Sequence, residues 1–369
     1  MRSRAKVSIL TVNKPALLLF TAVLYAGSLI SCKGGAAKDT AGTGTTPRVI
    51  LLAQYATEYQ NGYIRGCFDG ILQFYDESIE NQRSRGLYYD VYGYIKEENT
   101  ASAIQEASEE GDWDIIAIAG FTFSNALEQI APLYPNQRYI LIDTTGLVLP
   151  NAWQLVFAEE EGCYLVGAAA ALKSIEDGIK NPVFGFIGGV SSDVISRFEN
   201  GYINGVHSIL PDAPVHIFYA QAWDKPGLAY TMAMDWFNND TFIIFAAAGG
   251  TGKGMISAAR ECRQSGKNVW AIGVDIDQYD EGIYAPNLSA VYTSMIKRTD
   301  RILYEALDAI KNNSFWVSNN IILNLTNRGV GYTVTNSAMS AQIIERLSNI
   351  EIDIINGSIT VEPYAKKEG

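Results

Sequence analysis

The sequence predicts an α/β protein with two doubly wound lobes, each built on a parallel sheet, and a ligand cleft between them. Three observations predict this fold. Short apolar runs alternate with helical patterns along most of the chain, which is typical of parallel strands buried on both faces. The alternation forms two successive series. The length of 369 residues also exceeds what one ordinary α/β lobe needs.

The first series begins at VILLAQ and closes at RYILIDTT. Its expected strands are 49–54, 87–95, 114–120 and 138–145, and its expected helices are about 62–80, 100–110 and 124–134. Every strand but the last leads into a helical pattern, as in a parallel sheet with crossover helices.

The second series starts with QLVFA at 154–158 and runs to NVWAIGVD at 268–275. Its other expected strands are 181–190, 215–221 and 241–249, and its expected helices are 160–177, one through 200–201, 227–238 and one after Lys253. We therefore expect two lobes joined by a hinge. We assign 48–155 plus about 277–315 to the first lobe, and 156–276 plus about 316–369 to the second.

The N-terminal stretch predicts export and a lipid anchor. Four basic residues precede an uncharged apolar run that ends at Cys32, the layout of a secretory signal. Residues 29–32, LISC, match the bacterial lipobox. We expect a signal peptide at 1–31, lipidation of Cys32 and a flexible tether at 32–47, because glycine, alanine and threonine dominate that stretch. An uncleaved membrane anchor is the alternative.

The charge of the chain excludes some partners. Lys and Arg number 28 against 40 Asp and Glu, and removing residues 1–31 takes away four basic and no acidic residues, which leaves 24 against 40, a net charge of −16. An acidic body of this kind does not suit nucleic acid or anionic lipid. We expect contact with the membrane through the lipid alone and no nucleic-acid partner.

Cysteine and histidine usage gives no sign of catalysis. Besides Cys32, three scattered cysteines form no disulfide or zinc pattern. The histidines, His207 and His216, have no neighbouring Ser/Asp or Cys context for nucleophilic chemistry. The sequence therefore predicts no enzyme, no metal and no cofactor.

The ends of the expected strands are where a ligand should lie, because ligands of doubly wound sheets bind beyond the carboxyl ends of the strands. The residues at those ends are Gln54, Gly120, Phe121, Asp143, Gly189, Trp223, Gly249, Gly250 and Asp275. Aromatic rings and carboxylates suit a polar ring ligand. For Asp143 and Asp275 alone, capping of a helix N-terminus is an equally good explanation.

The stretch AAAGGTGKG at 246–254 resembles a phosphate loop but fails its pattern. Gly254 follows Lys253 where a magnesium-binding Ser or Thr belongs, and Ala247 replaces the leading glycine. We expect a glycine-rich turn that brings backbone amides close to a ligand. A tight turn without a ligand is the alternative.

Four blocks of sequence resemble a known family. VFAEEEGCYLVGAAAALKS, FIIFAAAGGTGKGMISAAR, VWAIGVDIDQY and YTSMIKRTD are similar to the basic membrane protein family of ABC-transporter substrate-binding lipoproteins, most closely its purine nucleoside receptor branch. The resemblance implies a type I periplasmic-binding-protein fold with three crossovers. It also implies a receptor that closes on a nucleoside and delivers it to ABC permease subunits.

The resemblance also implies roles for particular residues. Tyr63 takes the place of the base-stacking aromatic, and Phe198 and Trp223 that of the aromatics facing it. Asp275 and Lys297 fall on the ribose-holding pair. For any one aromatic side chain, core packing is the alternative explanation.

The remaining site positions include two departures from the family. Asp143 corresponds to the base-edge carboxylate, and the turn with Gly249 and Gly250 faces the sugar. Gln54 stands where the family usually has aspartate, and Ile64 replaces an asparagine in Gly62-Tyr63-Ile64. Because these changes remove a charge and an amide that would bind polar groups of the ligand, we expect an altered base preference or another ring-bearing ligand.

We therefore expect a non-enzymatic solute receptor of the bacterial cell envelope that binds a nucleoside, with purine favoured. A ligand sensor for a signalling partner, a binder of another ligand such as a sugar, and an enzyme acting on nucleosides are the alternatives.

Overall fold

The computed structural model describes residues 46–57, 61–315, 317–318 and 320–364. Both sheets lie in one compact unit, Thr43–Gly369. The expected signal peptide, Cys32 and nearly all of the expected tether fall outside the described residues.

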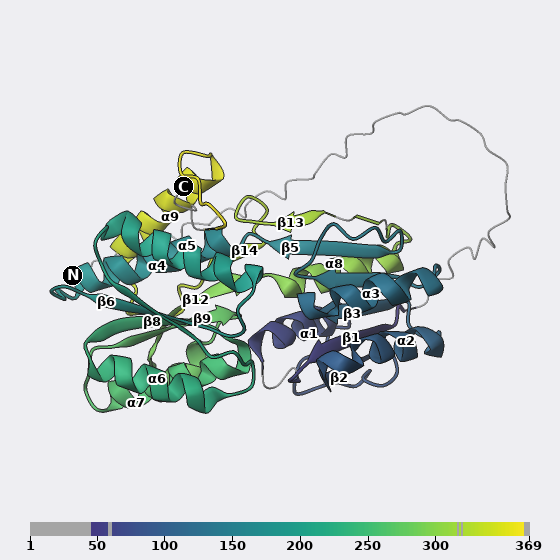
Figure 1. The fold of residues 1–369 in the computed structure, drawn as a ribbon, viewed down its shortest axis with the longest axis horizontal. Coiled ribbons are helices and arrows are strands. Elements are labelled where there is room, and N and C mark those ends of the chain that lie inside the picture. The colour runs from purple at the N-terminus through teal and green to yellow at the C-terminus, as the bar shows by residue number, and fades with distance from the viewer. Residues whose placement is uncertain (1–45, 58–60, 316, 319, 365–369) are drawn as a thin grey trace, which may run out of the picture. The chain divides into compact units, whose positions relative to one another are not determined.

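The first lobe is built on a wholly parallel sheet with the strand order β13-β5-β4-β3-β1-β2 (Figure 1). Its strands are β1 (Val49–Gln54), β2 (Tyr89–Ile95), β3 (Ile115–Ala119), β4 (Tyr139–Ile142), β5 (Ala152–Phe157) and β13 (Ile321–Leu323). Its helices are α1 (Gly62–Phe74), α2 (Thr100–Glu110), α3 (Ser124–Ile130) and α8 (Thr299–Lys311), with short 3-10 turns η1 (Glu97–Asn99), η2 (Phe121–Phe123) and η3 (Ala131–Leu133).

Strand β1 shows why the apolar runs form buried strands. Val49 and Leu51 pack into the core that includes α1 and α8, whereas Ile50 and Leu52 pack into the core that includes α2 and α3. Successive side chains of a strand point to opposite faces of the sheet, so a strand covered on both faces is apolar throughout.

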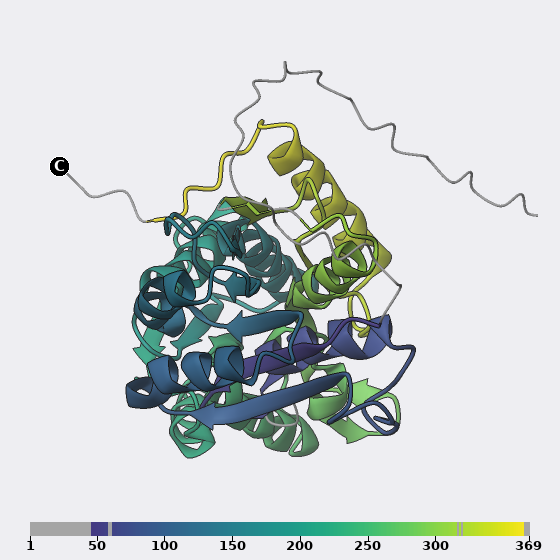
Figure 2. The ribbon, with the colours of Figure 1, turned by 90° about the vertical axis from the view of Figure 1, so that its right-hand side faces the viewer.

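The second lobe has the strand order β14-β12-β9-β8-β6-β7, parallel except for β14. Its strands are β6 (Val183–Gly188), β7 (Val215–Tyr219), β8 (Thr241–Ala247), β9 (Trp270–Asp275), β12 (Val291–Lys297) and β14 (Val330–Tyr332), beside a small pair, β10 (Ile283–Ala285) and β11 (Leu288–Ser289). Its helices are α4 (Glu159–Glu176), α5 (Asp193–Ile209), α6 (Pro226–Asn238), α7 (Gly252–Gln264) and α9 (Ala341–Ile355), with turns η4 (Gly249–Thr251) and η5 (Tyr279–Gly282). Figure 2 shows β1 and β2 in front of the green elements of this lobe.

Helices α4 and α5 lie with their backbones in contact. A Cβ atom added to Gly205 would lie 2.1 Å from the carbonyl oxygen of Tyr164, so only glycine permits this approach. The contact fixes the start of α4, which carries Glu159, beside the helix that carries Phe198.

The lobe boundaries differ from those expected at two strands of the large sheets and at the small pair β10–β11, which was expected in the first lobe but lies beside α7 in the second. β12 was expected in the first lobe but pairs with β9 in the second sheet, and β13 was expected in the second lobe but pairs with β5 in the first. The described chain passes between lobes three times, from β5 into α4, from β12 into α8 and from β13 into β14. Hydrophobic runs predict strands, but pairing decides which sheet each strand joins.

The two series of elements and the α/β fold class are as expected. Helix α1 begins at Gly62 but ends at Phe74 rather than near residue 80. The chain then turns through Asp76, whose φ of 55° lies in the left-handed region.

Candidate functional site

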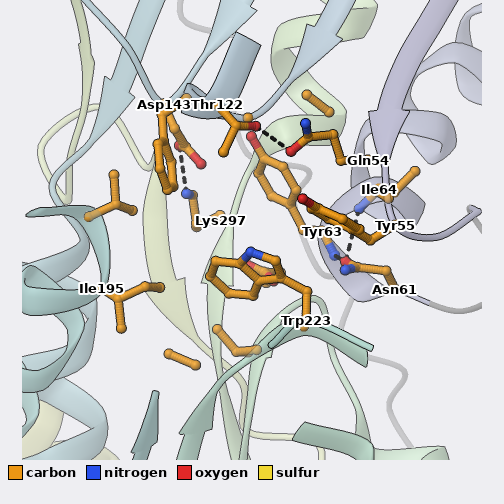
Figure 3. Close-up of a pocket in the computed structure, with 18 of the residues that line it drawn as sticks. Gln54, Tyr55, Asn61, Tyr63, Ile64, Thr122, Asp143, Ile195, Trp223 and Lys297 are labelled. Atoms are coloured by element: carbon orange, nitrogen blue, oxygen red, sulfur yellow. Dashed lines mark hydrogen bonds and ion pairs between the residues drawn. The ribbon is translucent and has the colours of Figure 1, made fainter. Parts of the chain in front are cut away.

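A cavity opens where the carboxyl ends of strands from both sheets meet (Figure 3). Its empty volume, including space open to solvent, is about 730 Å³, which suits a small organic ligand. It is lined by Gln54, Tyr55, Asn61, Tyr63, Ile64, Ala119, Gly120, Phe121, Thr122, Asp143, Val194, Ile195, Phe198, Trp223, Ala247, Gly249, Val274, Asp275 and Lys297. Every residue expected at the ligand site is among them except Gly189 and Gly250.

Backbone conformation directs several of these side chains. Tyr55 and Asp143 each follow a parallel strand, Asp275 ends one, and their φ values are 58°, 68° and 69°. Such left-handed conformations are uncommon for residues other than glycine and concentrate at functional sites. Neither aspartate caps a helix within the described chain, so the capping alternative does not explain them.

The Lys297 ammonium is the centre of the charged end of the cavity. Its Nζ donates to Asp143 Oδ1 at 2.7 Å and to Glu159 Oε1 at 3.0 Å. Lys297 ends β12, Asp143 follows β4 and Glu159 begins α4, so the ammonium connects the two lobes. Arg197 Nη1 lies 3.7 Å from the other Glu159 oxygen. Glu159 was not expected at the site from the sequence.

Asp275 lies at the same end without a bonding partner. The residue is 7% exposed and lines the cavity, yet no group in the described part of the chain donates a hydrogen bond to its carboxylate. A buried carboxylate is costly unless it is paired or hydrogen-bonded. Asp275 is therefore ready to accept hydrogen bonds from a ligand.

Burial and neighbouring charges shift the pKa values of this cluster. Burial raises the pKa of Glu159 to about 7, against the lowering effect of Lys297. Burial likewise raises the pKa of Asp275 to about 6, with Lys297 opposing and Asp143 adding to the rise. Burial lowers the pKa of Lys297, but Asp143, Glu159 and Asp275 outweigh it, and the ammonium stays charged.

Aromatic rings surround the ammonium and form the walls of the cavity. Lys297 Nζ lies 5.1 Å from the ring centroid of Tyr63, 5.7 Å from that of Phe198 and 4.6 Å from that of Phe157, within the range of cation–π attraction. Phe198 is only 3% exposed and packs against Phe245. Core packing therefore accounts for much of its role.

Trp223 and Tyr63 are two of the aromatic side chains that line the cavity, beside Tyr55 and Phe121. A Cβ atom on Gly189 would lie 2.3 Å from the Trp223 ring, so the indole rests directly on a glycine backbone. The Tyr63 hydroxyl faces the Asp143 carboxylate without a hydrogen bond of ordinary geometry, and burial followed by that carboxylate raises the pKa of Tyr63. Figure 3 shows the two rings from different lobes near the middle of the cavity.

Neutral amides form the other end of the cavity. Gln54 Oε1 accepts a hydrogen bond from the Thr122 hydroxyl, while the buried Gln54 Nε2 has no partner among the described residues. Asn61 Oδ1 accepts from the backbone N–H of Tyr63 and so caps α1. Ile64 is 2% exposed and contributes apolar surface.

The glycine-rich turn does not hold Lys253 toward the cavity. Gly249 has a φ of 54° and lines the cavity, and a Cβ atom there would lie 2.8 Å from Asn61 Nδ2. Lys253 pairs with Glu281 at 3.5 Å instead. The turn thus packs closely on the neutral end, as its glycines require.

Within the described ranges there is no group of three or more His, Cys, Asp and Glu side chains arranged to hold a metal ion. Nor does any helix of those ranges have the length and apolarity to cross a membrane.

Residues 61–364 match a family described as ABC transporter substrate-binding protein PnrA-like, designated Bmp. The chain belongs to this Bmp family. The resemblance seen in the four sequence blocks is thereby confirmed. As a Bmp protein the chain is a substrate-binding component of an ABC transporter.

Curated relatives of this Bmp protein cover much of its length. It is 28% identical to the "ABC transporter nucleoside-binding protein BmpA" of Lactococcus lactis subsp. cremoris, over 94% of this chain and 99% of that protein. It is 29% identical to the "CD4+ T-cell-stimulating antigen" of Listeria monocytogenes, over 74% and 77%. It is 25% identical to "Basic membrane protein A1" of Borrelia garinii subsp. bavariensis, over 95% and 96%.

A solved structure confirms the fold of the Bmp protein. An ABC transporter solute-binding protein from Aeropyrum pernix superposes with a TM-score of 0.74 at 22% identity, covering 87% of this chain and 95% of that one. The two-lobed periplasmic-binding architecture expected from the sequence is therefore present.

Sequence reasoning missed Tyr55, Asn61, Thr122 and Glu159 in this Bmp protein. Asn61 stands just before a helical pattern, which is an N-cap signal, and Thr122 follows an expected strand end. Glu159 gave no separate signal, because an acidic residue in the first turn of a helix is ordinary. Only the packing of α4 against β12 and α5 brings it to the site.

Proposed function

We propose that this Bmp protein is a receptor for ribonucleosides, with purine ribonucleosides favoured, and that it delivers them to ABC permease subunits. The observation that carries the proposal is the Asp275 carboxylate, which is buried, faces the cavity and lacks a hydrogen-bond donor among the described residues. Two vicinal hydroxyls of a ribose would supply the missing donors.

The charged end of the cavity suits a neutral sugar. Lys297 uses two of its three N–H bonds on Asp143 and Glu159, which leaves the third for a ring or hydroxyl oxygen. The three carboxylates around it oppose any phosphate brought to this end. A nucleoside therefore fits the site better than its nucleotide.

The aromatic walls suit a flat base. Trp223 and Tyr63 come from different lobes, so lobe closure would place a base between them. Base–aromatic stacking contributes about 1–3 kcal/mol per base. The Lactococcus lactis relative, named a nucleoside-binding protein, supports this assignment.

Anchoring through a lipid on Cys32 completes the proposed function, and it rests on the lipobox at 29–32. Mass spectrometry of the mature protein should find an acylated N-terminal Cys32, and Cys32→Ala should accumulate as unprocessed precursor. Normal cleavage and detergent partitioning of that variant would contradict the anchor.

The receptor is tested by calorimetric titration with ribonucleosides, their 2′-deoxy counterparts and the 5′-monophosphates. Removing one hydroxyl deletes a charge-assisted hydrogen bond to Asp275, which contributes about 1.5–3 kcal/mol. Ribonucleosides should therefore bind at least about tenfold more tightly than deoxyribonucleosides.

We call the ratio of ribonucleoside affinity to deoxyribonucleoside affinity the ribose preference. Asp275→Asn should bring this ratio close to one, because an amide accepts more weakly and also presents donors to the hydroxyls. Asp280→Asn, in the exposed turn that follows, is the matched control and should keep the preference. Equal affinity of the wild type for ribo- and deoxyribonucleosides, or no nucleoside binding, would reject the proposal.

A further inference from the structure

The charged end of the cavity contains more carboxylates than its lysine can pair. Asp143, Glu159 and Asp275 all act on Lys297, yet the ammonium donates to Asp143 and Glu159 and leaves Asp275 free. The proposed function depends on Asp275 being free. What keeps Lys297 away from Asp275 is therefore a property of the site.

Lys297 and Asp275 lie on neighbouring strands. In the β9–β12 pairing, Asp275 is opposite Ile296, the residue just before Lys297. Asp275 is also close enough for the Lys297 charge to act on its pKa. A lysine side chain has four rotatable carbon–carbon bonds and three donors, so an ion pair with Asp275 is the obvious competitor of the arrangement observed.

Glu159 bonds the ammonium from helix α4, beside the bond that Asp143 makes. It is 1% exposed, its Oε1 accepts from Lys297, and the glycine contacts between α4 and α5 fix its position. It also lies in the first turn of α4, where the helix dipole favours a negative charge. The rings of Phe157 and Phe198 lie 4.6 Å and 5.7 Å from the ammonium.

We propose that Glu159 is a positioning residue that holds the Lys297 ammonium away from Asp275 and so keeps the Asp275 carboxylate free for ligand hydroxyls. The inference rests on the proposed function for the ligand, but the positioning itself is a property of the ligand-free protein. Without Glu159, Lys297 turns toward Asp275 and competes with the ligand for that carboxylate.

The first test needs no ligand. Carbon-13 NMR titration of aspartate carboxyls, with Asp275 assigned through Asp275→Asn, should give a pKa near 6 for Asp275 in the wild type. In Glu159→Met, which fills a similar volume without an acceptor, an ion pair with Lys297 should move that pKa below its wild-type value. The titratable and charged groups that face the cluster are Asp143, Lys297, Arg197, Glu160, Tyr63, Cys67 and Cys163.

Glu159→Gln is the conservative partner of this variant. Its amide oxygen still accepts from Lys297, so the pKa of Asp275 should stay near the wild-type value. Glu160→Ala, at the next residue of the same helix turn, is the control. A pKa of Asp275 that stays unchanged in Glu159→Met, with only the melting temperature lowered, would show that Glu159 is merely structural.

The second test uses ribo- and deoxyribonucleosides. The ribose preference should fall at least about threefold in Glu159→Met and stay within twofold of wild type in Glu159→Gln. If the wild type binds no nucleoside while the Asp275 pKa moves as expected, the proposed ligand is wrong and the positioning role stands. A ribose preference lost in Glu159→Gln as well would overturn the positioning role, because that variant keeps the acceptor.

Discussion

The two ends of the cavity differ in how far the protein satisfies its own polar groups. At the charged end, Lys297 is bonded to carboxylates from both lobes and faces three aromatic rings. At the neutral end, Gln54 has one hydrogen bond to Thr122 and a buried amide nitrogen without a described partner. Figure 3 shows Lys297 on one side of Tyr63 and Gln54 and Asn61 on the other.

This difference indicates that the charged end and the neutral end of the cavity control different properties of the protein. A buried charge without its partner destabilises the protein strongly, so the charged end is tied to stability as well as to binding. An unpaired amide costs less and is satisfied when a ligand supplies an acceptor. We expect changes at the charged end to affect folding, and changes at the neutral end to affect the choice of ligand.

The largest effect should come from Lys297→Met. Losing the ammonium removes the cation that bonds Asp143 and Glu159 and acts on Asp275, and leaves Glu159 with Arg197 at 3.7 Å. Breaking a buried ion pair costs about 3–5 kcal/mol. The free energy of unfolding, measured by urea denaturation at pH 8, should fall by about that amount. Lys180→Met, at an exposed lysine, should change it by less than about 0.5 kcal/mol.

The decrease in the free energy of unfolding caused by Lys297→Met should depend on pH. The pKa of Glu159 is raised in the folded protein to about 7 from an ordinary 4.5, so the stability it contributes is present at low pH and is lost as pH rises through about 7. Lys297 lowers the pKa of Glu159 and of Asp275. Without it, the folded protein loses more stability as the pH rises. The difference between variant and wild type should be larger at pH 8 than at pH 5, and an equal difference at both would contradict the buried-cluster explanation.

A smaller effect, on selectivity, should come from Gln54→Glu. The buried Gln54 amide nitrogen has no described partner, so we expect it to donate to an acceptor on the ligand, whereas a carboxylate at this position would need an N–H on the ligand. Purine riboside has ring-nitrogen acceptors and no N–H on its base, while adenosine and inosine have both. Gln54→Glu should weaken the binding of purine riboside about tenfold more than the binding of inosine, the ratio that about 1.4 kcal/mol gives.

Calorimetry with the three nucleosides measures this, and thermal unfolding checks that the variant stays folded. Thr122→Val removes the hydroxyl that orients Gln54. It should therefore reduce the difference in affinity between purine riboside and inosine. If the wild type already binds purine riboside tenfold more weakly than inosine, Gln54 accepts a hydrogen bond from the ligand instead of donating one. The two ends of the cavity would then not differ as described.

Much of the fold could be predicted from the sequence. The apolar runs of β1, β3 and β8 identified buried strands because both faces of a covered parallel sheet are apolar. The membership of β12 and β13 could not be predicted, because each is an ordinary strand whose sheet is decided by pairing across the hinge. Local periodicity contains no information about that pairing.

The candidate site divides in the same way. The sequence by itself determined that Gln54, Asp143 and Asp275 stand at strand ends, since the carboxyl ends of parallel strands meet at one edge of a sheet. Only the tertiary structure decided that Lys297 bonds Glu159 and leaves Asp275 free. Lys297 and Glu159 are 138 residues apart in the sequence, and only the packing of helices and strands brings them together. The strength of a buried charge depends on the groups packed around it.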